Sequence, residues 1–124
     1  MASGPQVVEF SLKLITNTYT PGPAGSVLVQ ANLEGTGTGL GAVLGTATFA
    51  PAGMKNATYS WCGVSYLDNG DSITDNAQGT IESIGPHKWR TQGIDHLSDG
   101  RTMSVEGEID LAARTWTGKL IERS

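Results

Sequence analysis

The sequence contains few of the residues on which disulfides, metal sites and charged surfaces depend. Of its 124 residues, one is a cysteine, two are histidines and 16% are charged. A single cysteine cannot form an intramolecular disulfide, so packing must hold the fold together. The histidines and the cysteine show no zinc-binding spacing, and we expect no metal and no cofactor.

Basic clusters and long apolar runs are also missing. The formal net charge is −4, and no group of lysines or arginines offsets it. This charge argues against nucleic acid or an anionic membrane surface as a partner. No apolar run approaches the roughly 18 residues of a membrane span, and the first residues, MASGPQ, lack the features of a secretion signal. We therefore expect a cytoplasmic protein in which residues 1–124 form one domain.

The chain does contain 17 glycines and a marked alternation of apolar and polar residues. In 101–123 the apolar residues occupy every second position, which is typical of a half-buried strand. Folding this stretch back on itself places Ile109 opposite Trp116, two large apolar residues. The same register places Glu106 opposite Lys119, an acid opposite a base, and so predicts an antiparallel hairpin.

Eight strands are predicted by this pattern. They cover 6–15, 26–34, 42–50, 57–67, 72–84 and 88–97, and the last two lie inside 101–123. Consecutive strands with short connections indicate an all-β fold, a single antiparallel up-and-down β-barrel joined by short hairpins. Closure of the barrel would remove the unpaired edges of the sheet. A flattened two-sheet sandwich is the alternative.

One hairpin decides which aromatic residues face the interior. The pair Asn69-Gly70 is a strong signal for a tight turn, because both central residues of that turn need positive φ. A tight turn here predicts that Tyr66 and Cys62 lie on the inner face of their strand. Tyr59 and Trp61 would then face outward and form a patch suited to self-association.

Two carboxylates fall on the apolar face of their strands. A three-residue loop at 85–87 would place Glu82 opposite Arg90. This register makes Asp75 and Asp95 diagonal neighbours, roughly 7–8 Å apart at Cα. Carboxylates brought together on an inner face raise one another's pKa and are suited to work as acid and base. The alternative is that both lie at the barrel rim, solvated or capping turn amides.

The turn at Asp99-Gly100 leaves two registers open. A tight turn places His96 opposite Met103, whereas one extra loop residue places Leu97 opposite Met103. We prefer the second register, because it keeps one face of the sheet continuous and a bulge would supply the extra residue.

The segment 34–42, EGTGTGLGA, contains the G-x-G-x-x-A pattern of a dinucleotide-binding loop. Such a loop must follow a strand and open a helix, so that the phosphates meet the helix N-terminus. The residues that follow, VLGTATFA, have the pattern of a strand. We therefore interpret the segment as a turn, able to act as a mobile lip over a barrel mouth.

Large flat side chains on the inner face are candidates for the wall of a ligand site. Trp89 and Trp116 have the inward parity, and with Tyr66 and Cys62 they form the predicted ligand-binding set. Plain core packing is the alternative interpretation of the two tryptophans.

The order of these elements resembles that of small calycin-type barrels. The glycine-rich lip, the strand VLGTATFA, the Asn-Gly hairpin and the closing strand TWTGKLIE are similar to elements of allene oxide cyclase-like and lipocalin-like barrels. The resemblance implies a cavity for an apolar or cyclic small molecule, sometimes with isomerase or cyclase activity. It transfers no catalytic residue by motif.

Three hypotheses for function follow. The first is a barrel that binds a small apolar molecule. The second adds cofactor-independent isomerase or cyclase chemistry, with Asp75 and Asp95 as catalytic residues. The third is a packed, non-catalytic barrel that acts through homo-oligomerisation or other protein contacts. An apolar cavity favours carriage, a cavity lined by Asp75, Asp95 and Tyr66 favours chemistry, and a filled interior argues against both.

Overall fold

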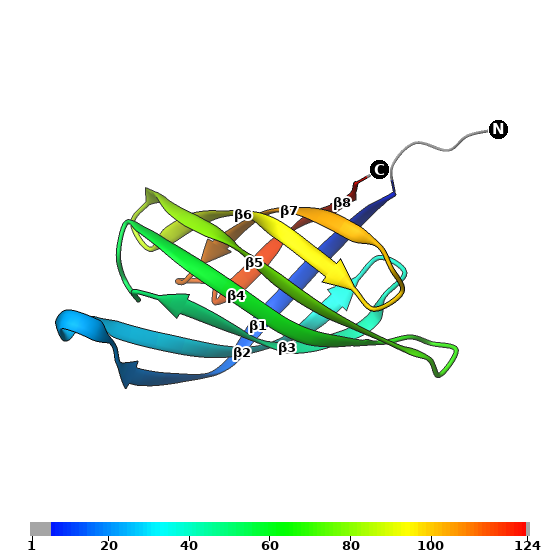
Figure 1. The fold of residues 1–124 in the computed structure, drawn as a ribbon, viewed down its shortest axis with the longest axis horizontal. Coiled ribbons are helices and arrows are strands. Elements are labelled where there is room, and N and C mark those ends of the chain that lie inside the picture. Colours follow the sequence, from blue (N-terminus) through cyan, green and yellow to red (C-terminus); the bar gives the residue numbers. More distant parts are fainter. Residues whose placement is uncertain (1–5, 124) are drawn as a thin grey trace.

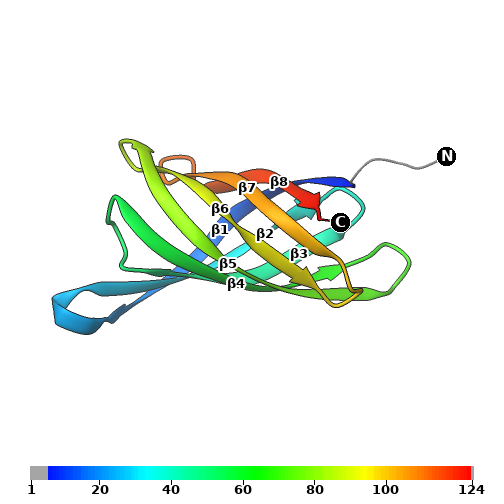
Figure 2. The ribbon, with the colours of Figure 1, turned by 45° about the horizontal axis from the view of Figure 1, so that its top comes forward.

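The computed structural model describes residues 6–123, which form a closed antiparallel barrel of eight strands in up-and-down order (Figures 1 and 2). The predicted fold class is therefore confirmed. The strands are β1 (Val7–Pro21), β2 (Val27–Gly37), β3 (Gly41–Ala50), β4 (Asn56–Tyr66), β5 (Ser72–Gly85), β6 (Lys88–Leu97), β7 (Thr102–Asp110) and β8 (Thr115–Glu122). Pairing of β1 with β8 closes the barrel.

Alternate residues of every strand fill the interior. The most completely buried are small or flexible side chains, such as Ala47 and Met103, both 0% exposed. Larger rings gather near the middle of the barrel, where Trp116 is 4% exposed. Burial of this apolar set drives closure, because each strand presents one apolar face and the barrel buries all of them together. Within the described residues, no helix has the length and apolarity that crossing a membrane requires.

Strand β1 extends beyond its predicted range. The prediction ended early because a β-bulge interrupts the alternation of apolar and polar residues on which it depended. Leu14 pairs with Leu33 and Thr16 with Asn32, which leaves Ile15 as the extra residue. After the bulge the parity of the strand changes, and the strand continues to Pro21 instead of ending at residue 15. The end of the β1–β2 hairpin projects beyond the other strands at one end of the barrel (Figure 1).

Two predicted registers are confirmed. In the β7–β8 hairpin, Ile109 pairs with Trp116 and Glu106 with Lys119. In the β5–β6 hairpin, Glu82 pairs with Arg90, and their side chains form an exposed ion pair of 2.8 Å. An acid–base pair defined the register of both hairpins, and in the β7–β8 hairpin the apolar pair Ile109–Trp116 required the same register.

The predicted register between β4 and β5 is wrong by one residue. Ser65 pairs with Ile73 and Trp61 with Ala77, because the connection is a five-residue loop in which Leu67 N donates to the Asp71 carbonyl. A slip of one residue turns every side chain to the other face. The side chain of Trp61 therefore points into the interior, and that of its neighbour Cys62 points outward.

This change of register moves four side chains of β4 to the face opposite to the predicted one. Tyr66 lies on the outer face with 51% of its surface exposed, and Cys62 is also exposed. Tyr59 and Trp61 are 3% and 6% exposed, so the predicted outward patch for self-association is wrong. Burial of two large rings favours the observed register over the tight Asn-Gly turn.

The β6–β7 hairpin follows neither register considered. Asp95 pairs with Met103, two residues away from the preferred alignment. The Leu97 amide donates to the Arg101 carbonyl and closes the loop earlier. A shift of two residues preserves the face, so Asp95, Leu97 and Met103 still share the interior, as expected.

The glycine-rich segment forms the β2–β3 hairpin and opens no helix, as interpreted from the strand pattern after it. Gly39 and Gly41 have positive φ, which glycine adopts without steric cost. Between them, Leu40 turns inward and is 6% exposed. Leu40 thus covers one end of the barrel, the end opposite to the projecting β1–β2 hairpin.

Candidate functional site

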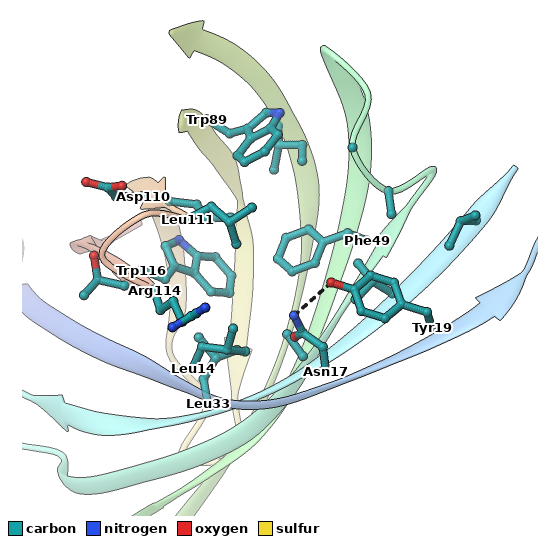
Figure 3. A pocket seen from close by; sticks show the side chains of 18 of the residues that line it. Leu14, Asn17, Tyr19, Leu33, Phe49, Trp89, Asp110, Leu111, Arg114 and Trp116 are labelled. Atoms are coloured by element: carbon teal, nitrogen blue, oxygen red, sulfur yellow. Dashed lines mark hydrogen bonds between the residues drawn. The ribbon is translucent and has the colours of Figure 1, made fainter. Parts of the chain in front are cut away.

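Among the cavities that the described residues form, two lie inside the barrel toward its opposite ends. The outer cavity, of about 360 Å³, lies at the end where the β1–β2 hairpin projects (Figure 3). The inner cavity, of about 50 Å³, lies toward the end covered by Leu40. Trp116 belongs to the walls of both.

The outer cavity has mainly apolar walls. Val29 and Leu33 from β2, Phe49 from β3 and Ile81 from β5 contribute side chains to it. Figure 3 shows Phe49 and the two tryptophans around the same space, with Trp89 near its rim. The Trp89 Nε1 donates to the Met54 carbonyl at 3.0 Å, which ties this ring to the β3–β4 loop.

One polar group in the outer cavity has an unused acceptor. Asn17 Nδ2 donates to Tyr19 Oη at 3.1 Å, drawn as a dashed line in Figure 3. Asn17 Oδ1 is buried and accepts no hydrogen bond from the described residues. Both residues follow the β1 bulge, which turned them toward the cavity. Arg114 and Asp110 are the charged residues of the lining, and Asp110 lies 3.9 Å from Lys88.

An aromatic layer separates the cavities. The Trp116 ring packs edge-on against Tyr59, Trp61 and Phe10, with centroids 5.3, 5.9 and 6.0 Å away. Its Nε1 donates to Thr91 Oγ1 at 3.1 Å, and Thr91 is 0% exposed. A ring held by one buried hydrogen bond and several aromatic contacts is a fixed partition.

Asp75 and Asp95 meet in the inner cavity. Asp75 pairs with Leu97 and Asp95 with Ala77, so the carboxylates are diagonal neighbours on the inner face of β5 and β6, as predicted from the 85–87 loop. Asp95 is 2% exposed, so the alternative of a solvated rim position does not hold for it. Their role in catalysis stays a prediction.

Trp61 holds Asp75 in place. Its Nε1 donates to Asp75 Oδ2 at 3.0 Å. The indole lies over two glycines, since a Cβ at Gly45 or Gly63 would come within 2.5 or 2.6 Å of the ring. These glycines make the space that a large ring needs beside the carboxylate.

Burial keeps Asp95 protonated around neutral pH. Its pKa rises from 3.8 to about 9, first through desolvation and then through a hydrogen bond to Asp75 and the charge of that carboxyl group. Burial and the nearby Asp95 also raise the pKa of the Tyr59 hydroxyl. The inner cavity therefore holds a neutral acid hydrogen-bonded to a second carboxyl group.

Three buried oxygens around this cavity accept no hydrogen bond from any N–H or alcohol group of the described residues. They are Asp75 Oδ1, Asp95 Oδ1 and Tyr59 Oη. Polar atoms inside a protein are usually paired with protein or with an ordered small molecule, since an unpaired group costs free energy. The unpaired set therefore points to an occupant.

The structure divides the predicted site residues into three groups. Trp89 and Trp116 line the outer cavity, as their inward parity indicated. Asp75 and Asp95 line the inner cavity. Tyr66 and Cys62 line neither cavity, because the β4 register turns them outward.

Several lining residues escaped prediction. Tyr59 and Trp61 were assigned to the outer face, and Asn17 lay beyond the predicted end of its strand. One signal could have found Trp61. Gly45 and Gly63 leave room for a large ring on the inner face of β3 and β4, and Trp61 has the parity of Gly63.

Comparisons with protein-family models, with curated proteins and with solved structures found no match to this chain. The class shown is therefore the closed eight-stranded antiparallel barrel. No group of three or more histidine, cysteine, aspartate or glutamate residues is placed to hold a metal ion within 6–123.

Proposed function

We propose that this barrel binds a small, largely apolar molecule in its outer cavity. The observation that carries the proposal is the cavity itself, with a volume of about 360 Å³ and apolar walls. This volume falls in the range of roughly 300–1,000 Å³ that small-molecule sites occupy. Trp89 and Trp116 would be the flat walls against which the ligand packs, and Asn17 Oδ1 would accept a hydrogen bond from it.

The resemblance to calycin-type barrels supports the same proposal at the level of architecture. Such barrels are similar to this chain in strand order and closure, and they imply an apolar ligand. Since fold alone does not define function, the proposal depends on the cavity and not on the resemblance.

The test fills the cavity and leaves the fold intact. Ala31 is buried in the cavity wall, and Ala42 lies on the outer face of the next strand. We expect the neutral fluorescent probe N-phenyl-1-naphthylamine to bind the wild type and to quench tryptophan emission. Ala31→Phe should weaken this binding at least tenfold, whereas the control Ala42→Phe should not change it. Equal binding by both variants, or none by the wild type, would contradict the proposal.

A second candidate function is acid–base catalysis by Asp75 and Asp95. The observation in its favour is that a neutral carboxylic acid, 2% exposed, is hydrogen-bonded to a second carboxyl group. Trp116 lines both cavities, so a substrate in the outer cavity would have to pass this ring to reach the two carboxyl groups. Exchange of the α-hydrogens of a small cyclic ketone with D₂O, followed by NMR, tests this function. Catalysed exchange should fall at least 100-fold in Asp95→Asn, and unchanged exchange would argue against the assignment.

A further inference from the structure

The inner cavity has a chemistry of its own, which does not depend on the outer cavity. Its lining combines two carboxyl groups, a phenol and a serine hydroxyl with the rings of Phe10, Trp61 and Trp116. The titratable groups that face Asp95 are Asp75 from β5 and Tyr59 from β4. The remaining lining residues, from β1, β3, β7, β8 and the β2–β3 turn, carry no charge, so no basic side chain is described there.

We propose that the inner cavity is a binding site for a small ammonium-type cation, with Asp75, Asp95 and Tyr59 as acceptors and Trp61 and Trp116 as aromatic walls. The cation is ammonium itself or, at most, a methylammonium group.

The size of the cavity sets the upper limit on the occupant. Its volume of about 50 Å³ exceeds the roughly 10–15 Å³ of cavity space that one water molecule needs. An ammonium ion is similar in size to water and fits. Trp116, which lines the cavity on its outer side, is held by its hydrogen bond to Thr91, and this favours a small occupant.

The arrangement of acceptors selects the kind of cation. Ammonium carries N–H donors that are satisfied by separate acceptors, and the cavity offers three unpaired oxygens: Asp75 Oδ1, Asp95 Oδ1 and Tyr59 Oη. Calcium and magnesium ions require about six or more oxygen ligands and do not suit this set. Aromatic faces attract a cation through their quadrupole, and this attraction strengthens when water is excluded.

The affinity of this site for ammonium should depend on pH, because binding changes the protonation of Asp95. Without a cation, Asp95 keeps its proton, because burial disfavours its charged form and the neighbouring Asp75 carboxyl group adds to this effect. When ammonium enters, Asp95 releases that proton, so one positive charge replaces another. Below the raised pKa of Asp95, we expect the affinity to increase up to tenfold for each unit of pH.

A single water molecule is the competing occupant. Water would also satisfy the three oxygens, but it would show no preference for one salt over another. The experiment therefore compares salts of equal ionic strength. It also detects the bound ion directly.

The experiment titrates the protein with ¹⁵N-labelled ammonium chloride and measures thermal stability in ammonium, sodium and choline chloride. We expect a separate proton signal from bound ammonium and higher stability in ammonium than in the other two salts. The difference should increase between about pH 6 and pH 8. No bound signal and equal stability in the three salts would overturn the proposal in favour of a water.

Variants connect the effect to the cavity. Asp95→Asn should weaken ammonium binding at least tenfold and remove its pH dependence, and Tyr59→Phe should weaken it without changing that dependence. Glu108→Gln, on the exposed outer face of β7, is the matched control and should behave as the wild type. If Asp95→Asn does not fold, Tyr59→Phe still decides, because unaltered binding in that variant contradicts the site. The ammonium experiments do not depend on the function proposed for the outer cavity. If the fluorescent probe fails to bind there, the expected results for ammonium in the inner cavity stay the same.

Discussion

At the scale of single residues, Asp95 makes the stability of the barrel depend on pH. The pKa of its carboxyl group is 3.8 when unperturbed and about 9 in the folded barrel. Between these values the folded protein keeps a proton that the unfolded chain has lost. The free energy of unfolding therefore decreases as pH rises from about 4 to about 9, by at most about 1.4 kcal/mol per pH unit.

We predict that Asp95→Asn removes this dependence. An asparagine has nearly the shape of the protonated acid and does not ionise, so the variant should lose less stability than the wild type between about pH 5 and pH 9. Urea denaturation in sodium buffers at several pH values measures the two slopes. Asp71→Asn, in the exposed β4–β5 loop, is the control and should keep the wild-type slope. Parallel slopes for wild type and Asp95→Asn would show that Asp95 is not buried as a neutral acid.

At the scale of elements, the sequence predicted hairpins well wherever two independent pairings agreed. In the β7–β8 hairpin an apolar pair and an acid–base pair both required one register, and that register is observed. The β4–β5 hairpin offered only the turn signal Asn69-Gly70, and the loop proved longer than a tight turn. The energy that decided this register comes from Tyr59 and Trp61, whose neighbours belong to distant strands. Such neighbours are not visible in a local pattern.

The second half of β1 was not predicted, because the bulge changes the phase of the apolar and polar alternation. An extra residue at Ile15 breaks the alternation, so 16–21 no longer follows the phase of 8–14. Asn17 and Tyr19, which line the outer cavity, were missed with it. The catalytic candidates Asp75 and Asp95 were brought together correctly because their hairpin contained no irregularity near them.

The projecting part of the β1–β2 hairpin should be the least stable part of the sheet. β8 pairs with β1 only from Val7 to Lys13, and β3 pairs with β2 only from Val29 onward. Residues 16–21 therefore have one strand neighbour among the described residues. Local stability follows the number of contacts that must break on opening.

We predict that the backbone amides of 16–20 and of Leu28 exchange with D₂O at least 100-fold faster than those of the central strand β7. Hydrogen exchange measured by NMR gives both sets in one experiment, with the ladder of β7 as the internal control. If the amides of the projecting hairpin were as well protected as those of β7, and this protection depended on protein concentration, the edge of β1 would not be free. Such a result would show instead that a second copy pairs with β1.

At the scale of the whole molecule, closure of the sheet was predictable, but the contents of the barrel were not. Eight alternating strands with short connections favoured an up-and-down barrel over a two-sheet sandwich, and the barrel is observed. The two cavities depend on how a few rings fill the interior, and on glycines such as Gly45 and Gly63 that give Trp61 its place. These are contacts between strands, and they arise only after every register is settled.

The Trp116 partition makes the two cavities separate sites, and their occupants should bind independently. Two ligands are coupled only when one of them favours a conformation that changes the affinity for the other. Trp116 is held from both sides, by Phe49 at 6.2 Å and Tyr59 at 5.3 Å between ring centroids, and by its hydrogen bond to Thr91. A ring fixed in this way does not move when a ligand binds on one side of it. Saturating N-phenyl-1-naphthylamine should therefore change the ammonium affinity by less than about twofold.

Titration of ammonium with and without the probe measures this coupling. Trp116→Phe is the informative variant, because a smaller ring without the indole N–H frees Thr91 and thins the partition. In this variant the affinity of each ligand should depend on the other. Coupling above about tenfold in the wild type would mean that Trp116 moves on binding. The interior would then be one continuous chamber, in which a ligand of the outer cavity reaches the carboxyl groups of Asp75 and Asp95.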